Sequence, residues 1–356
     1  MVVYHRVTQE ELYRFAYEVF RAAGASEAAA KAIAYNLTQG ELHGMGSHGV
    51  SRLMPVYVER LRNGGTNPDP QIKVLQRRKS TAIVDGDGGA GAQVALFAMG
   101  VAIDIAREEG TGWVAVRNSS HFGAAFITAR EALKHDMIGV ATTASIPLQP
   151  PYGGRARALG TNPLCWCIPG GKQGDVIFDM ATTVVAKGKL LLAIMEGKPI
   201  PEGWALDEEG RPTTDPVAAD KGVMLPLGGP KGYGLAMIAE IFSSILTGAE
   251  FGPRINNLYG DTSLPQKLGH FLGAIDVAAF MPPERFRARM DELIEFLRSI
   301  PLAPGHKEIL IPGELERRKA EEYSREGIPI AEDVVASHNK IAADLGVRPL
   351  QTQPPH

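Results

Sequence analysis

The stretch TAIVDGDGGAGAQVALFAMGVAIDIAREEGTGWVAV (residues 81–116) has the spacing of a strand, a glycine-rich turn, a helix and a second strand. Thr81–Asp85 is a short β-type run, residues 92–109 repeat apolar side chains at helical spacing, and Trp113–Val116 is β-type again. The same alternation continues with a helix predicted over 123–135, strands over 137–143, 164–168 and 176–178, and a further strand over 269–276. It predicts an α/β domain.

The turn inside this stretch fits the pattern G-x-G-x-x-G from Gly86 to Gly91, which is the fingerprint of a Rossmann dinucleotide site. Two observations argue against that interpretation. The second strand ends in Arg117-Asn118 rather than in the acid that holds a ribose, although an arginine could accept a 2′-phosphate. Asp85 and Asp87 would also repel a pyrophosphate, and such turns form for backbone reasons alone.

Both ends of the chain are predicted to be helical. Near the amino end, helices are capped at Thr8 and Ser26, and a third runs from about Val50 to Asn63. Helices are also predicted over 183–196, 232–248, 284–299, 314–326 and 330–345. We expect residues 1–75 and 281–346 to form one helical subdomain around an α/β cofactor- and substrate-binding domain at 76–280. Residues 347–356 are expected to be a tail with QTQPPH frayed.

Composition excludes several classes of protein. The 356 residues are 44% hydrophobic and carry a formal net charge of −3 without a basic stripe, so we expect no nucleic-acid partner. The sequence has no signal-peptide pattern and no apolar run near the ~20 residues that span a bilayer, so we expect a cytoplasmic protein without a membrane partner. Cys165 and Cys167 are interpreted as buried thiols, and no metal site is predicted.

Two histidine segments carry the chemistry. In SHGVSR (47–52), His48 and Arg52 are four residues apart, so they share a face at a helix start, and Ser47 is placed to orient the imidazole. Histidine exchanges a proton near neutral pH, and arginine binds a carboxylate. In NSSHFGAA (118–125), His121 lies between a strand and a helix, where α/β folds bind ligands. A purely structural role, as a helix cap or a satisfied histidine, stays open for both segments.

Together these segments resemble the type 2 malate/L-lactate dehydrogenase family. Its members include ureidoglycolate, sulfolactate and diketogulonate enzymes and piperideine/pyrroline-2-carboxylate reductases. The resemblance covers about three-quarters of the chain, in the family's order. It rests on SHGVSRL (47–53), VDGDGGAGAQV (84–94), NSSHFGAA (118–125), LGTNP (159–163), FDMATTVVAKGK (178–189), IPEGWALDEEGRPTTDP (200–216) and LGGPKGYGLA (227–236).

The resemblance implies a non-Rossmann fold with a mixed sheet flanked by helices and a helical subdomain formed from both chain ends. It also implies a homodimer that binds NAD or NADP near the subunit interface, with NAD slightly favoured here. Its catalytic residues would be His48, Ser47 and His121, with Arg52 and Thr161 on the substrate. Which histidine donates the proton is left open. The implied cofactor-binding residues are His121, Phe122, Gly123, Ala124, Ala125, Asp179, Met180, Ala181, Lys187, Gly188, Pro230, Lys231, Gly305, His306, Lys307 and Glu308.

The expected activity is reversible hydride transfer between the nicotinamide cofactor and C2 of a small 2-hydroxy or 2-oxo acid. The alternative within the family is reduction of a cyclic imine. The imine-reducing members carry an acid where this chain has Lys189, which disfavours that alternative. Glu41, His43 and the segment 142–145 also depart from the family pattern and leave the substrate side chain open. A nucleotide-binding protein without catalysis is a remote alternative, and a serine hydrolase built on Ser47 lacks a nucleophile elbow.

Overall fold

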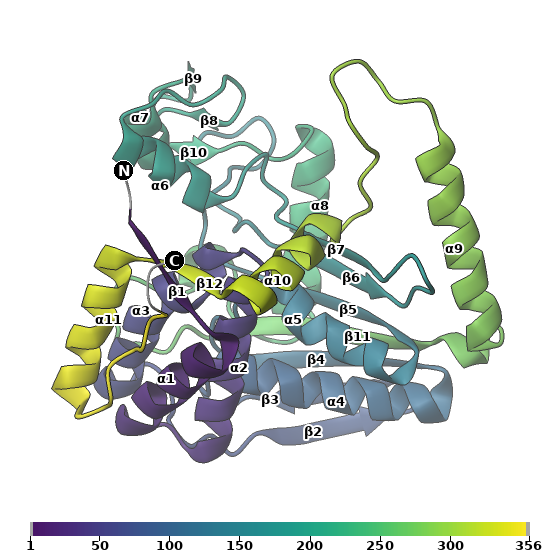
Figure 1. Cartoon of the computed structure of the whole chain (residues 1–356), viewed down its shortest axis with the longest axis horizontal. Helices are drawn as coiled ribbons and strands as arrows, with labels where there is room; N and C mark the ends of the chain where they lie inside the picture. Colours follow the sequence, from purple (N-terminus) through teal and green to yellow (C-terminus); the bar gives the residue numbers. More distant parts are fainter. Residues whose placement is uncertain (1–2, 354–356) are drawn as a thin grey trace.

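The computed structural model describes residues 3–353 and is built on a seven-stranded sheet (Figure 1). The strand order is β2-β3-β4-β11-β5-β6-β7. The pair β3–β4 is parallel, and all other neighbouring strands run antiparallel. The strands are β2 (Lys73–Arg78), β3 (Thr81–Asp85), β4 (Thr111–Ser119), β5 (Met137–Thr143), β6 (Leu164–Ile168), β7 (Val176–Met180) and β11 (Leu268–Asp276). The predicted mixed sheet is confirmed.

One face of the sheet is covered by the helix that the opening stretch predicts. The helix α4 (Gly91–Glu109) packs on β4 and β11, and α5 (Ala125–Ala129) with η2 (Arg130–His135) covers β5 and β6. Their shared core is rich in alanine and valine, which lets helix and sheet approach closely. It also buries Cys165 and Cys167 as free thiols with their Sγ atoms 3.9 Å apart, as predicted.

The opposite face of the sheet meets α8 (Pro230–Glu240) and its continuation η3 (Ile241–Ile245). The sequence predicts one helix over 232–248, but η3 has π-helical hydrogen bonding. There Ser243 donates to the carbonyl of Ala239, and Thr247 donates to that of Ser243. Side-chain hydroxyls that bond to backbone carbonyls compete with regular helix geometry, which apolar periodicity alone does not reveal.

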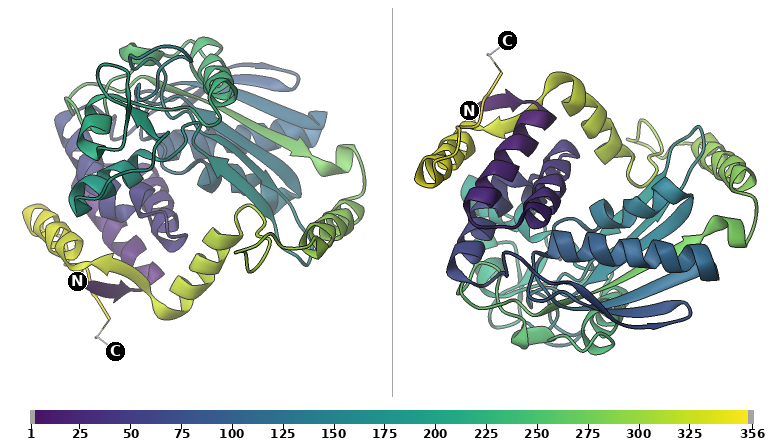
Figure 2. Two further views of the ribbon diagram at one scale, coloured as in Figure 1. Left: turned by 90° about the horizontal axis from the view of Figure 1, so that it is seen from above. Right: turned by 90° about the horizontal axis from the view of Figure 1, so that it is seen from below.

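The two chain ends lie side by side (Figure 2) and share a second hydrophobic core. It combines α1 (Gln9–Ala22), α2 (Glu27–Leu42) and α3 (Val50–Asn63) with α10 (Glu314–Glu326) and α11 (Glu332–Leu345). The predicted caps are confirmed, because Thr8 and Ser26 accept the amides of Glu11 and Ala29 at 3.1 and 3.3 Å. The sequence reading missed β1 (Tyr4–Val7), which pairs with β12 (Ile328–Ala331) and joins the two ends.

Two features at the carboxyl end differ from expectation. The helix α9 (Pro283–Ser299) lies beside the β6–β7 connection, where Asp291 accepts the amides of Lys172 and Gln173, rather than in the core of the chain ends. Residues 351–353 are hydrogen-bonded rather than frayed, since Gln353 donates to the carbonyl of Arg6. Residues 354–356 of the predicted tail lie outside the described residues. The division of the chain into domains stays a prediction.

A small unit covers one end of the large sheet. It contains α6 (Lys187–Glu196), α7 (Pro216–Lys221) and a three-stranded sheet of β8 (Ala205–Leu206), β9 (Pro212–Thr213) and β10 (Val223–Met224). Its own core is small, and Val185 and Met224 pack on Leu148 of the main body. Over residues 3–353, no helix is both long and apolar enough to cross a bilayer.

Candidate active site

A cavity of about 340 Å³ lies where the ends of β4 and β5 meet α3 and the start of α6. Its walls come from segments far apart in the sequence, including 45–53, 121–125, 143–148, 179–188 and 258–268. Most of the residues predicted to act on substrate or cofactor line it. They are Ser47, His48, Arg52, His121, Phe122, Gly123, Ala124, Ala125, Thr161, Asp179, Ala181, Lys187 and Gly188.

The corner that carries His48 is fixed by a buried carboxylate. Rather than sharing one helix with Arg52, His48 ends the short 3₁₀-helix η1 (Gly46–His48), and Arg52 lies in the first turn of α3. The Glu41 carboxylate accepts the amide of Ser51 at 2.6 Å, and burial raises its pKa. A Cβ on Gly49 would lie 2.6 Å from Glu41, so only glycine lets the chain pass this carboxylate. The sequence reading noted Glu41 but missed this role.

The two predicted histidines face each other across the cavity floor. Their rings are nearly parallel, with centroids 5.9 Å apart and an interplanar angle of 19°. The Nδ1 atom of His48 lies 2.9 Å from the Ser47 hydroxyl. Desolvation lowers the pKa of His48 to about 4 and that of His121 to about 3. Arg52 lowers the pKa of His48 further, and the neighbouring histidines His48 and His270 lower that of His121 further. Both imidazoles are therefore neutral at pH 7.

His121 is held by a tyrosine that the sequence reading missed. The hydroxyl of Tyr57 lies 2.6 Å from Nδ1 of His121, and the Gly123 amide donates to the same nitrogen at 3.3 Å. Since Nδ1 accepts the Gly123 N–H, the ring proton belongs on Nε2. The backbone amide of His121 donates to Gln266 at 2.9 Å, which fixes the segment itself. Tyr57 sits two turns after Val50 on α3, so helical spacing offered a signal.

Arg52 is steered by a second tyrosine. Its Nε donates to the Tyr259 hydroxyl at 3.1 Å, and its guanidinium carbon lies 5.6 Å from the Tyr259 ring centroid. The loop that carries Tyr259 is anchored by buried Arg60, which donates to the carbonyls of Leu258 and Leu264. The remaining nitrogens of Arg52 are thus positioned at the cavity that it lines.

Thr161 is set by a polar network behind the cavity wall. Its amide donates to the Ser145 hydroxyl at 2.9 Å, and the two hydroxyls lie 3.2 Å apart. The buried Asn162, with a left-handed φ of 23°, accepts the Ser145 amide and donates to Glu240 at 2.6 Å. The segment 142–145, whose departure from the family pattern left the substrate open, therefore lies directly at the cavity.

Two charged residues close the far side of the cavity. Asp179 accepts the amide of Phe126 at 2.9 Å, and desolvation raises its pKa to about 6. Lys187, in the first turn of α6, forms an ion pair with Asp220 of the same small unit. Arg52 forms no ion pair within residues 3–353, which leaves its charge available for an anion.

The glycine-rich turn at 85–91 lies outside this cavity. The amides of Gly86 and Gly88 donate to the carbonyls of Arg117 and Asn118, and that of Gly91 donates to the Ser120 hydroxyl. A Cβ on Gly91 would lie 2.0 Å from the Ser120 carbonyl oxygen. Close packing against the neighbouring loop thus explains why glycines are required in this turn. The amides that a pyrophosphate would need already donate to that loop.

Seven predicted cofactor residues do not line the cavity. Met180 is adjacent to it in sequence only, Pro230 and Lys231 are exposed at the start of α8, and Gly305, His306, Lys307 and Glu308 lie exposed between α9 and α10. Glu308 forms an ion pair with Arg318. Apart from Tyr259 and Gln266, the lining that the sequence did not single out is mainly apolar, including Ile146, Leu148, Leu258 and Leu268.

Comparison with known protein sequences identifies the family of this chain. The family model for malate/L-lactate dehydrogenase matches residues 7–338, so the chain belongs to the malate/L-lactate dehydrogenase family. Among its relatives, L-sulfolactate dehydrogenase from Methanocaldococcus jannaschii is 39% identical over 330 residues, covering 93% of this chain and 94% of that protein. Malate dehydrogenase from Pyrococcus abyssi is 39% identical over 356 residues, covering 98% and 97%.

The fold agrees with the same family. The solved structure of sulfolactate dehydrogenase from M. jannaschii superimposes with a TM-score of 0.90 at 37% identity, covering 96% of this chain and 98% of that one. The family resemblance inferred from the motifs is therefore confirmed.

Proposed function

We propose that this chain is a NAD(P)-dependent dehydrogenase that reversibly transfers hydride between the cofactor and C2 of a small 2-hydroxy or 2-oxo acid, of malate or lactate type. The observation that carries the proposal is the convergence of two neutral imidazoles and one free guanidinium on a single cavity. Relatives named for NAD(+) and for NADP(+) both occur, so either dinucleotide fits the family.

The residues present suit a nicotinamide dinucleotide. The backbone of 122–125 lines the cavity, where its Gly123 amide already donates to His121, and Asp179 can accept a ribose hydroxyl. The sheet has a single parallel pair of strands, and the amides of the turn at 85–91 donate to carbonyls of the protein. We therefore infer that the dinucleotide binds in a way that differs from the Rossmann fold. His121–Ala125, Asp179, Ala181 and Lys187–Gly188 would hold the cofactor. The bound dihydronicotinamide supplies the hydride that reduces C2.

Arg52 binds the substrate carboxylate in this mechanism. A guanidinium offers two parallel N–H donors, and Tyr259 already occupies Nε, so the outer nitrogens meet the carboxylate oxygens. The carbonyl then lies towards the histidines, and the substituent at C3 meets the wall of Ser145, Thr161, Ile146 and Leu148. The space beside this wall accommodates a small acid.

His48 moves the proton, and His121 holds the oxygen. As the Nε2–H tautomer, His121 donates a hydrogen bond to the carbonyl oxygen and stabilises charge as it develops. His48, oriented by Ser47, protonates the nascent alkoxide during reduction and accepts the hydroxyl proton during oxidation. The lowered pKa of His48 makes the neutral base the resting form at pH 7, which favours oxidation of the hydroxy acid.

We also propose a cytoplasmic homodimer. The helix α8 and η3 expose a continuous apolar face, in which Ile238, Ile241, Ile245 and Leu246 are 44–56% exposed. Apolar patches of this kind are typical of protein interfaces. Light scattering at micromolar concentration tests the dimer, and Ile245→Glu is expected to shift it towards the monomer.

The decisive experiment measures oxidation of NADH and NADPH, by loss of dihydronicotinamide absorbance, with pyruvate, oxaloacetate, sulfopyruvate, the oxidised ureidoglycolate and a cyclic imine side by side. We expect turnover with a 2-oxo acid. Faster turnover with the imine would favour the reductase alternative. Cofactor binding without oxidation by any compound would show a nucleotide-binding protein and contradict the proposal.

A further inference from the structure

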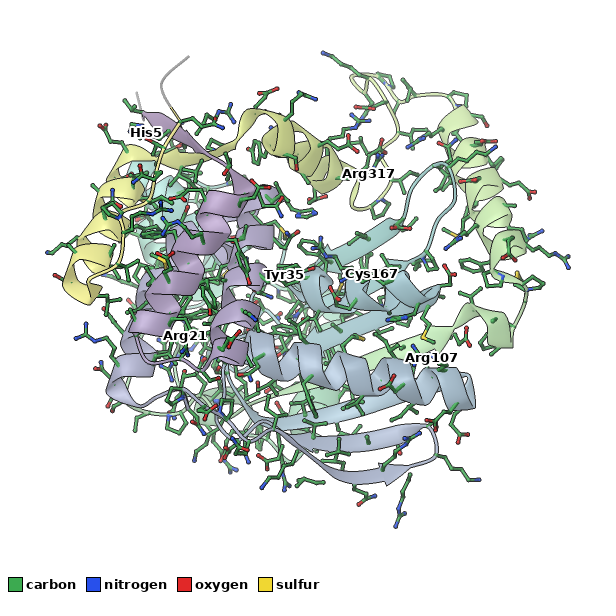
Figure 3. All side chains as sticks on the ribbon, turned by 60° about the horizontal axis from the view of Figure 1, so that its bottom comes forward. His5, Arg21, Tyr35, Arg107, Cys167 and Arg317 are labelled. Atoms are coloured by element: carbon green, nitrogen blue, oxygen red, sulfur yellow. The ribbon has the colours of Figure 1, made fainter. Side chains whose placement is uncertain are left out.

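Arg60 is the only buried arginine in the part of the chain that the structure describes. It lies in the last turn of α3 and is 1% exposed, whereas Arg107 and Arg317 lie at the surface (Figure 3). Those two each pair with a carboxylate, but Arg60 forms no ion pair within residues 3–353. Withdrawing a charge from water costs free energy, which a carboxylate or several hydrogen bonds must offset.

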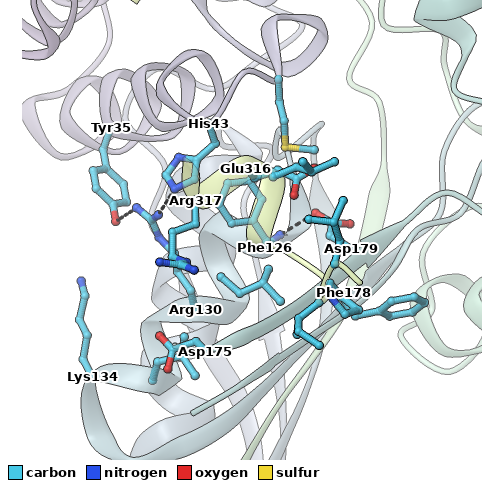
Figure 4. Close-up of a pocket in the computed structure, with 18 residues that line it drawn as sticks. Tyr35, His43, Phe126, Arg130, Lys134, Asp175, Phe178, Asp179, Glu316 and Arg317 are labelled. Carbon is cyan, nitrogen blue, oxygen red and sulfur yellow. Dashed lines mark hydrogen bonds between the residues drawn. The ribbon is translucent and has the colours of Figure 1, made fainter. Parts of the chain in front are cut away.

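Arg60 has no room for a ligand beside it. The space that it lines has a volume of about 10 Å³, which accommodates at most one water molecule. Arg130, which is half-buried, opens instead onto a cavity of about 680 Å³ whose lining also includes Asp175 and Glu316 (Figure 4). The groups that hold Arg60 therefore come from the protein itself.

The Arg60 guanidinium binds backbone carbonyls of two segments. Nη1 donates to the carbonyl of Leu258 at 3.4 Å, and Nη2 donates to the carbonyl of Leu264. Nη2 also lies 3.4 Å from the carbonyl oxygen of Gly65, to which it donates just after the end of α3. The guanidinium thus ties the end of α3 to the loop 258–266 near both ends of that loop.

The middle of the loop also packs closely against the end of α3. A Cβ on Gly65 would lie 2.1 Å from the carbonyl oxygen of Thr262, so only glycine permits this approach. The side-chain amide of Asn63 donates to the Thr262 hydroxyl at 2.7 Å. The loop is therefore held by α3 along its whole length.

This loop supplies one contact to each of two groups in the active site. Tyr259 accepts a hydrogen bond from Nε of Arg52 at 3.1 Å, and the side chain of Gln266 accepts the backbone amide of His121 at 2.9 Å. Tyr259 and Gln266 both line the active-site cavity. A shift of the loop would therefore move both the guanidinium that faces the substrate and the segment that carries His121.

We propose that Arg60 is a positioning residue of the active site, which holds the loop 258–266 so that Tyr259 orients Arg52 towards the substrate carboxylate and Gln266 fixes His121. The proposal rests on the proposed dehydrogenase function. A guanidinium suits this role because its planar donors reach several carbonyls at once, whereas lysine has one point charge on a flexible stem. The role also explains why the fold buries a charge without a carboxylate partner.

Binding of oxamate, an analogue of a 2-oxo acid that is not reduced, tests the positioning of Arg52 without turnover. Calorimetry measures it on the enzyme saturated with the dinucleotide. In Arg60→Met the affinity for oxamate should fall about tenfold, the range for a hydrogen bond to a charged group, with the KM for the oxo acid rising in parallel. The affinity for the dinucleotide alone should stay near wild type.

A double substitution separates positioning from a general loss of stability. Tyr259→Phe should itself weaken oxamate binding, and Arg60→Met should weaken it little further in that background, because residues that act through one another are not additive. A general loss of stability would add to either background. Arg60→Lys keeps the charge but not the planar fork, so it should have a smaller effect and serves where Arg60→Met does not fold.

Arg62→Met is the matched control, because Arg62 is exposed two residues later on the same helix and forms no ion pair within the described residues. It should bind oxamate as the wild type does. Amide hydrogen exchange over 258–266 should become faster in Arg60→Met and not in Arg62→Met, which reports release of the loop independently of catalysis.

The outcomes separate this proposal from the proposed function. If Arg60→Met binds oxamate as tightly as Arg62→Met, or if its effect adds fully to that of Tyr259→Phe, Arg60 does not position the site, even when oxo acids are reduced normally. If oxamate binding depends on Arg60 in the expected way but no oxo acid is turned over, the positioning role stands and the dehydrogenase function fails.

Discussion

Two glycine-containing connections follow the neighbouring parallel strands β3 and β4 at the same edge of the sheet, and each leads into a helix. The two connections have different roles. The first, 85–91, has the spacing of a dinucleotide fingerprint, but its amides bond to the protein and its glycines accommodate a neighbouring loop. The second, 118–125, has no such spacing but places His121 and the backbone of 122–125 at the cavity. Spacing alone therefore does not identify the site, because the connection without the fingerprint is the one that lines the cavity with the two histidines.

The largest predicted effect is a difference in kcat between substitutions at the two connections. His48 stacks on His121 of the second connection, and His48→Ala should lower kcat by about 10²- to 10⁴-fold because it removes general acid–base catalysis. Asp87→Asn in the first connection should leave kcat and the KM for the dinucleotide near wild type. Steady-state kinetics with both substrates measures this. A His48→Ala enzyme within tenfold of wild type would remove His48 from the proton transfer.

The desolvated imidazoles also predict a pH profile. Because desolvation lowers the pKa of His48 to about 4, the protonated donor falls about tenfold per pH unit above that value. We expect kcat/KM for reduction to decrease steadily from pH 5 to 8, while kcat/KM for oxidation, which needs the neutral base, stays level. Both directions are measured in the same buffers. A level profile for reduction over this range would contradict the assignment.

Substitution of an arginine near each connection should also affect the kinetics differently. Arg52→Ala should lower kcat/KM for the oxo acid by about 10- to 100-fold, chiefly through KM, since charged hydrogen bonds contribute about 1.5–3 kcal/mol. Arg117 pairs with Asp85 beside the first connection, where a Rossmann enzyme could read a 2′-phosphate. Arg117→Ala should leave the ratio of NADH to NADPH turnover unchanged. A changed ratio would return the first connection to the cofactor site.

Stability should report on the first connection. Gly91→Ala places a Cβ 2.0 Å from the Ser120 carbonyl oxygen, and overpacking of this kind should lower the free energy of unfolding by about 2 kcal/mol. Gly100→Ala, on the same helix with no atom within 4 Å of the added Cβ, should instead be neutral or stabilising by up to about 1 kcal/mol. Urea unfolding compares them. Unchanged stability with weakened dinucleotide binding would overturn the packing explanation.

The smallest effect concerns the support of the second connection. Tyr57→Phe removes the hydroxyl 2.6 Å from His121 Nδ1, worth about 1 kcal/mol, so kcat should fall about fivefold with KM little changed. Tyr17→Phe, a half-buried tyrosine stacked on Tyr13, is the control. If Tyr57→Phe raised KM without affecting kcat, Tyr57 would support substrate binding rather than the tautomer of His121.

Local signals in the sequence were sufficient for most of the elements. The helix at 50–63 and the strands at 137–143 and 164–168 have the predicted bounds, because apolar periodicity and the glycines at the ends act within a few residues. The strand β1 escaped notice because its partner β12 lies more than 300 residues later, and four residues offer little periodicity. Tyr259 escaped notice because a single tyrosine in a loop has no pattern, and the role of Glu41 depends on contacts with the residues around Gly49 and Ser51.

The sequence by itself determined most of the helices and strands, and it determined which chemical groups are available: two imidazoles, a guanidinium and several backbone turns. Only the tertiary structure decided which of these groups meet. It brings His48 against His121 and turns the fingerprint glycines towards a loop. The physical reason is range: periodicity and capping act over one or two turns, whereas contacts between distant segments depend on how complete surfaces pack.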